Sequence, residues 1–139
     1  MLTLAEVTER MGLHASPRRV LVVEDAIPWL RRLTAFWEEA GHEVVAMTGV
    51  TEIVGHLAIG PGDPEGSVVQ VDLQTIDAAF LDHYFLSRTY DGVSLTRELT
   101  ARGCFHILAM SSDAGANARM AQAGALLAGR KSEWMRLFD

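Results

Sequence analysis

Four short apolar runs in this chain each lead into polar residues. Together these residues supply three carboxylates, a hydroxyl and an ammonium group, a set that can bind a cation and a phosphoryl group. The runs and the residues that follow them are 20–23 with Glu24 and Asp25, 78–81 with Asp82, 107–110 with Ser111, and 125–128 with Lys131. Runs that are apolar on both faces are typical of parallel strands. Because the carboxyl ends of parallel strands meet at one edge of a sheet, where ligands bind, we expect these side chains to converge on one site.

The rest of the chain alternates between strand and helix patterns. We predict strands at 19–24, 43–47, 77–82, 104–110 and 125–129, and helices at 28–40, 50–59, 93–102, 113–122 and 133–138, the last capped by Ser132. The segment 60–66 is rich in Gly and Pro and predicts a loop, and the alternation in 67–73 is compatible with a short extra strand. This order predicts an α/β fold with a doubly wound, five-stranded parallel sheet.

The amino-terminal residues predict a separate short helix. Thr3 and Glu6 fit a capping box, and Gly12 is placed to end the helix. The segment loosely resembles the opening of a DNA-binding helix-turn-helix, but a recognition helix is missing. We therefore interpret 1–17 as an amphipathic extension with a linker, packed on a main domain at 18–139.

Composition narrows the function classes. A chain of 139 residues, 49% of them hydrophobic, can form one domain with a full core. The net charge of −6, without a block of Lys or Arg, argues against direct contact with nucleic acid. Cys104 is the only cysteine, so an internal disulfide is excluded. Neither a signal peptide nor a membrane-spanning stretch is evident, so we expect a cytoplasmic protein.

Five fragments in this order resemble the receiver domain of two-component response regulators, which has a flavodoxin-like fold. The fragments are VLVVEDAIPWL from Val20, IDAAFLD from Ile76, DGVSLTREL from Asp91, HILAMSS from His106 and AQAGALLAGRK from Ala121. The resemblance covers the chain from about Arg18 onward. It implies that this domain takes part in phosphorelay signalling and is not an enzyme beyond its own phosphoryl transfer.

The resemblance implies a magnesium site among the acidic residues. Asp25, Asp82 and the backbone carbonyl of Tyr84 would bind Mg²⁺, and Glu24 would assist through a water molecule. This ligand set agrees with the preference of Mg²⁺ for a few carboxylate oxygens together with water.

The resemblance also implies how phosphate would be accepted. Asp82 would take the phosphoryl group, Ser111 would hydrogen-bond to it, and Lys131 would pair with Asp82 before the reaction and with the phosphoryl group after it. The donor would be a histidine kinase or a histidine phosphotransfer protein. Because about one short helix follows Lys131, we expect a stand-alone receiver that signals by contact with a downstream protein, and by family analogy it can form a homodimer.

Four features depart from the family pattern. Asp82 follows Asp25 by 57 positions, about a dozen more than usual, with the excess at 60–75. The loop after Asp82 is also longer, with Leu86 where proline is common. Ala128 replaces the aromatic residue that turns inward on activation, so we expect output through the loop after Ser111 and the fourth helix, or through self-association on the face of the fourth helix, the fifth strand and the last helix. Ser132 replaces the proline that follows the lysine through a cis peptide, and we expect a trans bond because a cis bond before a non-proline residue costs about 2.5–4 kcal/mol.

Two other functions remain open at this point. A pseudo-receiver would act as a constitutive protein-interaction module without phosphorylation, and the residues at Ala128 and Ser132 favour it. A small phosphohydrolase on a similar fold would need a second acid two residues after the nucleophile, where this chain has Tyr84. The complete set of acids with Ser111 and Lys131 favours the phosphorylated receiver.

Overall fold

A computed structural model describes residues 2–14, 17–85 and 89–138. The predicted linker at 16 and the loop position Leu86 lie outside the described residues. In chain order the elements are α1 (Leu4–Arg10), β1 (Arg19–Val23), α2 (Ile27–Glu39), β2 (Glu43–Met47), β3 (Glu52–Val54), β4 (Leu57–Pro61), β5 (Val68–Asp72), a 3-10 turn η1 (Leu73–Thr75), β6 (Ala78–Leu81), α3 (Gly92–Ala101), β7 (Ile107–Ala109), α4 (Ala114–Ala123), β8 (Leu127–Ala128) and α5 (Lys131–Leu137).

The central sheet has five parallel strands in the order β2-β1-β6-β7-β8. This confirms the predicted doubly wound α/β fold. The three central strands are buried along nearly their whole length, as their apolar sequences require. The strand order reverses at β1, so the carboxyl ends of β1 and β6 flank the switch point where such sheets bind ligands.

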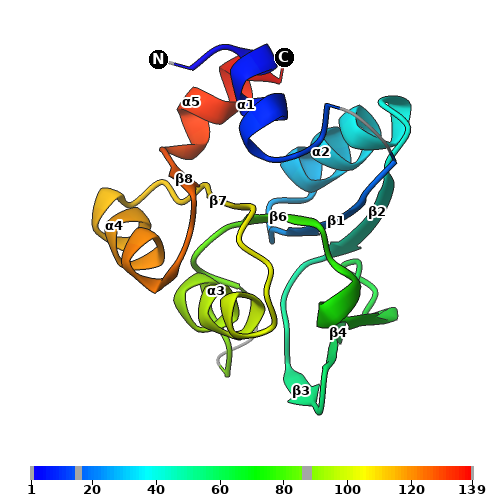
Figure 1. The fold of residues 1–139 in the computed structure, drawn as a ribbon. Helices are drawn as coiled ribbons and strands as arrows, with labels where there is room; N and C mark the ends of the chain where they lie inside the picture. The colour runs from blue at the N-terminus through cyan, green and yellow to red at the C-terminus, as the bar shows by residue number, and fades with distance from the viewer. Residues whose placement is uncertain (1, 15–16, 86–88, 139) are drawn as a thin grey trace.

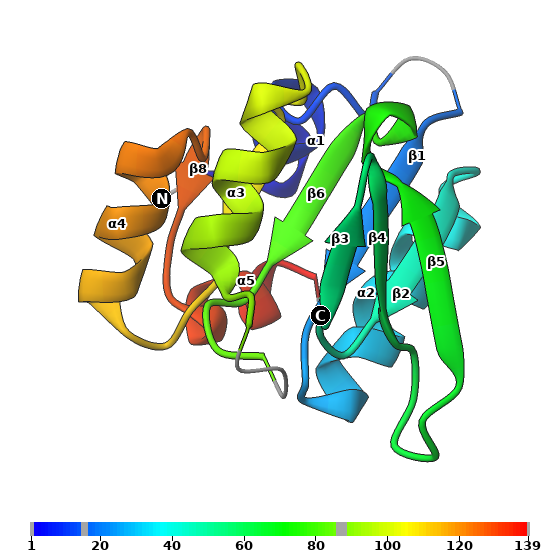
Figure 2. The same ribbon diagram turned by 90° about the horizontal axis from the view of Figure 1, so that it is seen from below.

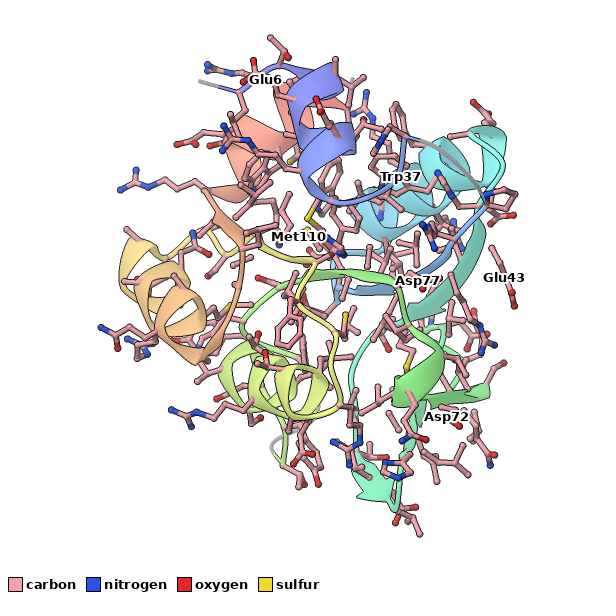
Figure 3. All side chains as sticks on the ribbon, viewed as in Figure 1. Glu6, Trp37, Glu43, Asp72, Asp77 and Met110 are labelled. Carbon is pink, nitrogen blue, oxygen red and sulfur yellow. The ribbon has the colours of Figure 1, made fainter. Side chains whose placement is uncertain are left out.

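Two hydrophobic layers enclose the sheet, and Figure 1 shows the helices that lie on either side of it. One layer joins α1, α2 and α5 to the sheet around Trp37 and Phe80, and the other joins α3, α4 and the segment between β2 and β6 around Leu81 and Leu95. Figure 3 shows Trp37 and Met110 among the layers, whereas Glu43 and Asp72 lie at the periphery. The layers hold the sheet rigid and leave its edges to carry polar groups.

The segment between β2 and β6 differs from the prediction. The helix predicted at 50–59 is wrong: β3, β4 and β5 form a three-stranded antiparallel meander there instead. The extra strand considered at 67–73 is confirmed as β5. Val50, Ile53, Val54 and Leu57 have helical spacing, but β-branched residues favour strands, and Gly55, with φ of 62°, makes the tight turn between β3 and β4.

Long-range contacts hold the meander in place. A Cβ atom on Gly60 would lie 2.1 Å from the carbonyl oxygen of Gly49, so only glycine allows the two backbones to approach. Arg102, at the end of α3, donates to His56 Nδ1 at 3.0 Å and to the carbonyl of Gly55 at 2.8 Å. Neither contact can be anticipated from the local pattern of residues 50–59.

The two ends of the chain lie on the same face of the sheet. Thr3 and Glu6 form the predicted capping box, and Val7 and Met11 are buried with α2 and α5. At the other end, the predicted cap at Ser132 is wrong, because α5 begins at Lys131 with Arg130 as its N-cap. None of the helices in the described ranges is long and apolar enough to cross a membrane.

Candidate functional site

The acidic residues predicted from the strand ends meet at the carboxyl edge of the sheet. Glu24 and Asp25 follow β1, and Asp82 follows β6. Asp82 N donates a hydrogen bond to the carbonyl of Val23 at 3.0 Å, so Asp82 lies next to the end of β1. One carboxylate oxygen from each of the three lies within 4.8 Å of the others. The arrangement brings two negative charges from one strand against a third from its neighbour.

Lys131 supplies the positive charge of this cluster. Its Nζ lies 3.3 Å from Asp82 Oδ2 and also donates to Glu24 Oε1, so one ammonium group bridges two carboxylates. The peptide bonds in the described segments are all trans, which confirms the trans bond expected between Lys131 and Ser132. The lysine therefore reaches the acids from the first turn of α5.

Burial and mutual repulsion make the acids hard to ionise. Glu24 is fully buried, and this burial, followed by the charge of Asp82, raises its pKa to about 8 against the partial compensation of Lys131. The pKa of Asp25 is raised for the same two reasons in the same order. Burial lowers the pKa of Lys131, but its hydrogen bond to Glu24 and the nearby carboxylates together raise it.

One oxygen of this cluster lacks a partner. Glu24 Oε2 is buried, and no hydrogen bond to it is formed by any residue that the structure describes. Buried polar atoms are nearly always satisfied, so an unpaired carboxylate oxygen beside two further acids needs a cation or water. Even with a proton on Glu24, the carboxylates of Asp25 and Asp82 outnumber the one ammonium group, and an all-oxygen set suits a hard divalent cation. The residues therefore fit Mg²⁺.

The backbone around Asp82 is held by the start of α3. Asp82 Oδ1 accepts from His83 N at 2.8 Å, and the carbonyl of His83 accepts from Gly92 N at 2.7 Å. A Cβ atom on Gly92 would lie 2.4 Å from the carbonyl oxygen of Asp82, so glycine is required at this first helical position. The Asp-Gly pair at the helix start thus fixes the peptide that carries Asp82.

Ser111 follows β7, which is the neighbour of β6 in the sheet. It is buried, and its Oγ accepts from Asp113 N at 3.1 Å. Asn117, which the sequence reasoning missed, holds it from α4: Asn117 Oδ1 accepts from Ser111 N, and its Nδ2 donates to the carbonyls of Ser111 and Gly129 at 2.9 and 3.0 Å. In the sequence, only its position as a polar residue within an alanine-rich helix distinguishes Asn117 as a candidate for a structural role.

Two remaining residues have less defined places in the site. Tyr84 is 59% exposed, and its ring lies edge-on to that of His83 at 4.3 Å between centroids. The role of its carbonyl as a metal ligand stays a prediction. Ala128 is exposed on β8 and leaves the position beside α4 without a large side chain.

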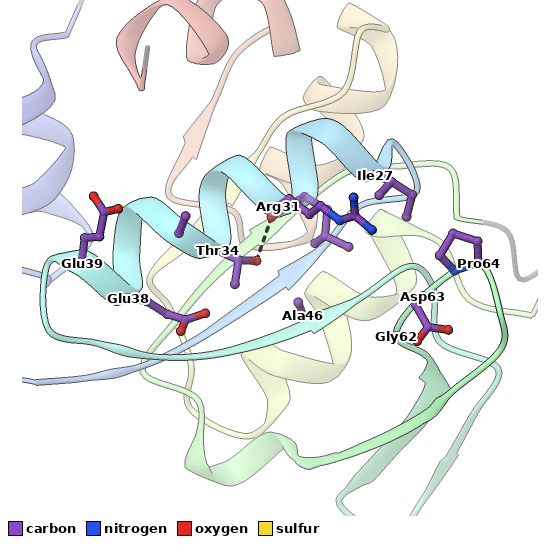
Figure 4. Close-up of a pocket in the computed structure, with 11 residues that line it drawn as sticks. Ile27, Arg31, Thr34, Glu38, Glu39, Ala46, Gly62, Asp63 and Pro64 are labelled. Carbon is purple, nitrogen blue, oxygen red and sulfur yellow. Dashed lines mark hydrogen bonds between the residues drawn. The ribbon is translucent and has the colours of Figure 1, made fainter.

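A separate cavity of about 490 Å³ lies between α2, β2 and the loop that joins β4 to β5 (Figure 4). Arg31, Thr34 and Glu38 line it along α2, opposite Asp63 and Pro64. The strand-end residues contribute nothing to this lining, which lacks Glu24, Asp25, Asp82, Ser111 and Lys131. The cavity is therefore distinct from the strand-end cluster.

Comparison with known proteins gives a structural match without a sequence match. No family model and no curated protein matches the chain. A two-component response regulator from Clostridium difficile superposes with a TM-score of 0.54 at 13% identity, covering 86% of this chain and 89% of that one. A receiver domain protein from Methanospirillum hungatei gives 0.55 at 15% identity, with 87% and 90% covered.

A third neighbour is the receiver domain of a sensor histidine kinase from Pseudomonas aeruginosa, whose structure has a magnesium ion coordinated in the active site cleft. It superposes with a TM-score of 0.53 at 19% identity, covering 88% of this chain and 95% of that one. The three matches are to one response regulator and two receiver domain proteins. The chain therefore has the CheY-like receiver fold of response regulators.

Proposed function

We propose that this protein is a response regulator receiver that accepts a phosphoryl group on Asp82 in a magnesium-dependent reaction. The observation that carries the proposal is the bridge from Lys131 to Asp82 and Glu24, beside the unpaired oxygen of Glu24. A structural ion pair would need only one acid. Three acids beside one ammonium group, with one oxygen unpaired, form a site that a further cation would complete.

Each residue then has a role in the transfer. Glu24, Asp25, Asp82 and the carbonyl of Tyr84 would hold Mg²⁺, which would supply positive charge to neutralise the phosphoryl oxygens. An oxygen of Asp82 attacks phosphorus, a P–O bond forms, and the P–N bond to the donor imidazole breaks. The released imidazole nitrogen takes the electron pair of that bond and a proton from solvent.

The other two polar groups act after the attack. Lys131 leaves its contact with the carboxylate oxygen that has become an acyl phosphate and pairs with the phosphoryl oxygens. Ser111 donates its hydroxyl proton to one of these oxygens, and this requires it to reorient from its bond with Asp113 N. Because this bond holds Asp113, its loss would free the loop between β7 and α4, while Asn117 keeps the backbone of Ser111 in place.

The partners follow from this chemistry. A histidine kinase or a histidine phosphotransfer protein in the cytoplasm would be the donor, and a downstream protein would read the phosphorylated form. With Ala128 in place of an aromatic residue, we propose that output uses the loop after Ser111 and helix α4. Beyond its own phosphorylation and dephosphorylation, the protein would have no enzymatic activity.

Intact mass spectrometry tests the proposal. Incubation with acetyl phosphate and Mg²⁺ should add one phosphoryl group to the wild type and none to Asp82→Asn, and omission of Mg²⁺ should prevent the addition. A wild type that stays unmodified at saturating donor and metal would rule out the proposed reaction and favour a constitutive interaction module.

A further inference from the structure

The strand β4 is apolar on both of its faces, although the meander covers only one of them. Its inward positions are Ala58, which belongs to the layer around α3, and Gly60, which lies against Gly49. Its outward positions are Leu57, Ile59 and Pro61. A strand with one solvated face normally alternates apolar and polar residues, and a strand apolar throughout is typical of burial on both sides. The composition of β4 therefore indicates that its outer face is covered in use.

The flanking strands extend this outer face. Val54 on β3 stands opposite Leu57, and Val68 on β5 stands opposite Pro61, so their side chains share the outward side. Val54 is 58% exposed, Leu57 41% and Val68 70%. Figure 2, seen from below, shows the three strands in front, with no described helix or strand over them. We call these four apolar residues, together with Ile59, the outer meander face.

Charge around the outer meander face has one sign. Its remaining outward positions are Glu52, Gln70 and Asp72, which carry two negative charges and none positive. The nearby Arg102 is engaged by Glu98 and by the β3–β4 turn. A second copy would bring like charges together, and a surface with acidic groups is repelled by anionic lipid. The complementary partner has basic groups beside apolar ones.

The dimensions of the face suit a helix. Leu57, Ile59 and Pro61 extend over roughly 14 Å at about 3.4 Å per residue, which is a little more than two turns of about 5.4 Å each. Three strands span roughly 10 Å, close to the diameter of a helix. In the rest of this fold, helices cover the sheet. We infer that the outer meander face docks an amphipathic helix of a partner protein, with an apolar stripe flanked by Lys or Arg.

A defined peptide tests this inference. The probe is a labelled peptide of about 18 residues made of leucine and lysine, with the leucines at helical spacing, and its matched control carries glutamate for lysine. Fluorescence anisotropy should show saturable binding of the lysine peptide to the wild type and at least tenfold weaker binding of the glutamate peptide. Equal binding of both peptides would overturn the charge assignment.

Variants locate the binding. The triple variant Leu57→Thr, Ile59→Thr, Val68→Thr keeps β-branched residues on the exposed face and should weaken binding at least tenfold, with circular dichroism to check the fold. The double variant Glu52→Lys, Gln70→Lys makes the net charge of the outer meander face positive, and it should also weaken binding of the lysine peptide at least tenfold. Leu126→Thr removes an apolar side chain of similar exposure on another face and should leave binding unchanged.

Three results separate this inference from its alternatives. Unchanged binding in the triple variant would place the peptide elsewhere and overturn the inference. A wild-type dimer by sedimentation that the triple variant abolishes would assign the face to a second copy, and would overturn it too. Asp82→Asn should bind the peptide like the wild type, so a failure of the proposed phosphorylation does not affect this test.

Discussion

Lys131 Nζ lies 3.3 Å from Asp82 Oδ2, although the two residues are 49 positions apart and belong to different elements. The contact joins the start of α5 to the carboxyl end of β6 through the sheet edge. Because the same ammonium group also pairs with the buried Glu24, its removal has consequences for both stability and chemistry.

Substitution of Lys131 by glutamine should destabilise the protein in a pH-dependent manner. At pH 8 it leaves Glu24 and Asp82 without their cation, and we expect a loss of about 3–5 kcal/mol in the free energy of unfolding. At pH 5, where Glu24 carries a proton, the loss should be smaller. Urea denaturation at both pH values measures it, and an equal loss at both would contradict the coupling to Glu24.

The raised pKa of Glu24 should make the metal-free protein less stable as pH rises. Its pKa is about 8 in the folded protein against 4.5 for the unfolded value, so the folded state holds the proton across this window and the unfolded state does not. Stability is therefore greatest below about pH 4.5, as far as this group is concerned, and is lost as pH rises towards 8.

Thermal unfolding between pH 5 and 8 measures this dependence. Glu24→Gln should flatten the slope, because it removes the ionisation. Millimolar Mg²⁺ should raise the melting temperature more at pH 8 than at pH 5, since the metal competes with the proton. A slope that is the same in wild type and Glu24→Gln would assign the dependence to another group.

Asp25→Asn should weaken Mg²⁺ binding at least tenfold and slow phosphorylation by acetyl phosphate. The reason is the loss of one of three carboxylate oxygens that lie within 4.8 Å of one another. Isothermal titration calorimetry measures the affinity. Glu52→Gln removes an exposed carboxylate on the meander and is the matched control. Equal affinities in wild type and Asp25→Asn would refute the ligand role of Asp25.

Asn117→Ala should cost about 1–3 kcal/mol of stability, because Ser111 N and the carbonyls of Ser111 and Gly129 lose their partner. It should also slow phosphorylation, since Ser111 and the segment before Lys131 are no longer held together. Gln122→Ala, at an exposed position of the same helix, is the control. Unaltered phosphorylation in Asn117→Ala would show that these bonds serve the fold alone.

Tyr84→Gly should shorten the lifetime of the phosphorylated form. Tyr84 stands two residues after Asp82, where its ring can shield the acyl phosphate from water, and its present contact with His83 keeps it beside the site. The rate of phosphate loss after removal of the donor measures the effect. Identical rates in the two proteins would exclude a shielding role.

The sequence alone predicted the central sheet and placed the candidate site residues at its carboxyl edge. Each strand of that sheet is a short apolar run, and the residue after it follows the strand to the carboxyl edge, so Glu24, Asp25, Asp82 and Ser111 could be placed without coordinates. Lys131 required only the next step, the connection from β8 to α5. These assignments depend on local pattern and on the parallel arrangement that the pattern predicts.

Tertiary structure decided what local pattern could not. The pattern of residues 50–59 suits either a helix or a hairpin. The hairpin is held by the close approach of the Gly60 and Gly49 backbones and by the hydrogen bond from the distant Arg102 to the carbonyl of Gly55. The role of Asn117 depended on the meeting of α4 with β7 and β8. Helix α5 begins at Lys131, and Trp134 Nε1 ties it to the strand ends by donating to the carbonyls of Ala109 and Gly129. In each case the deciding interaction joins elements that propensity treats separately.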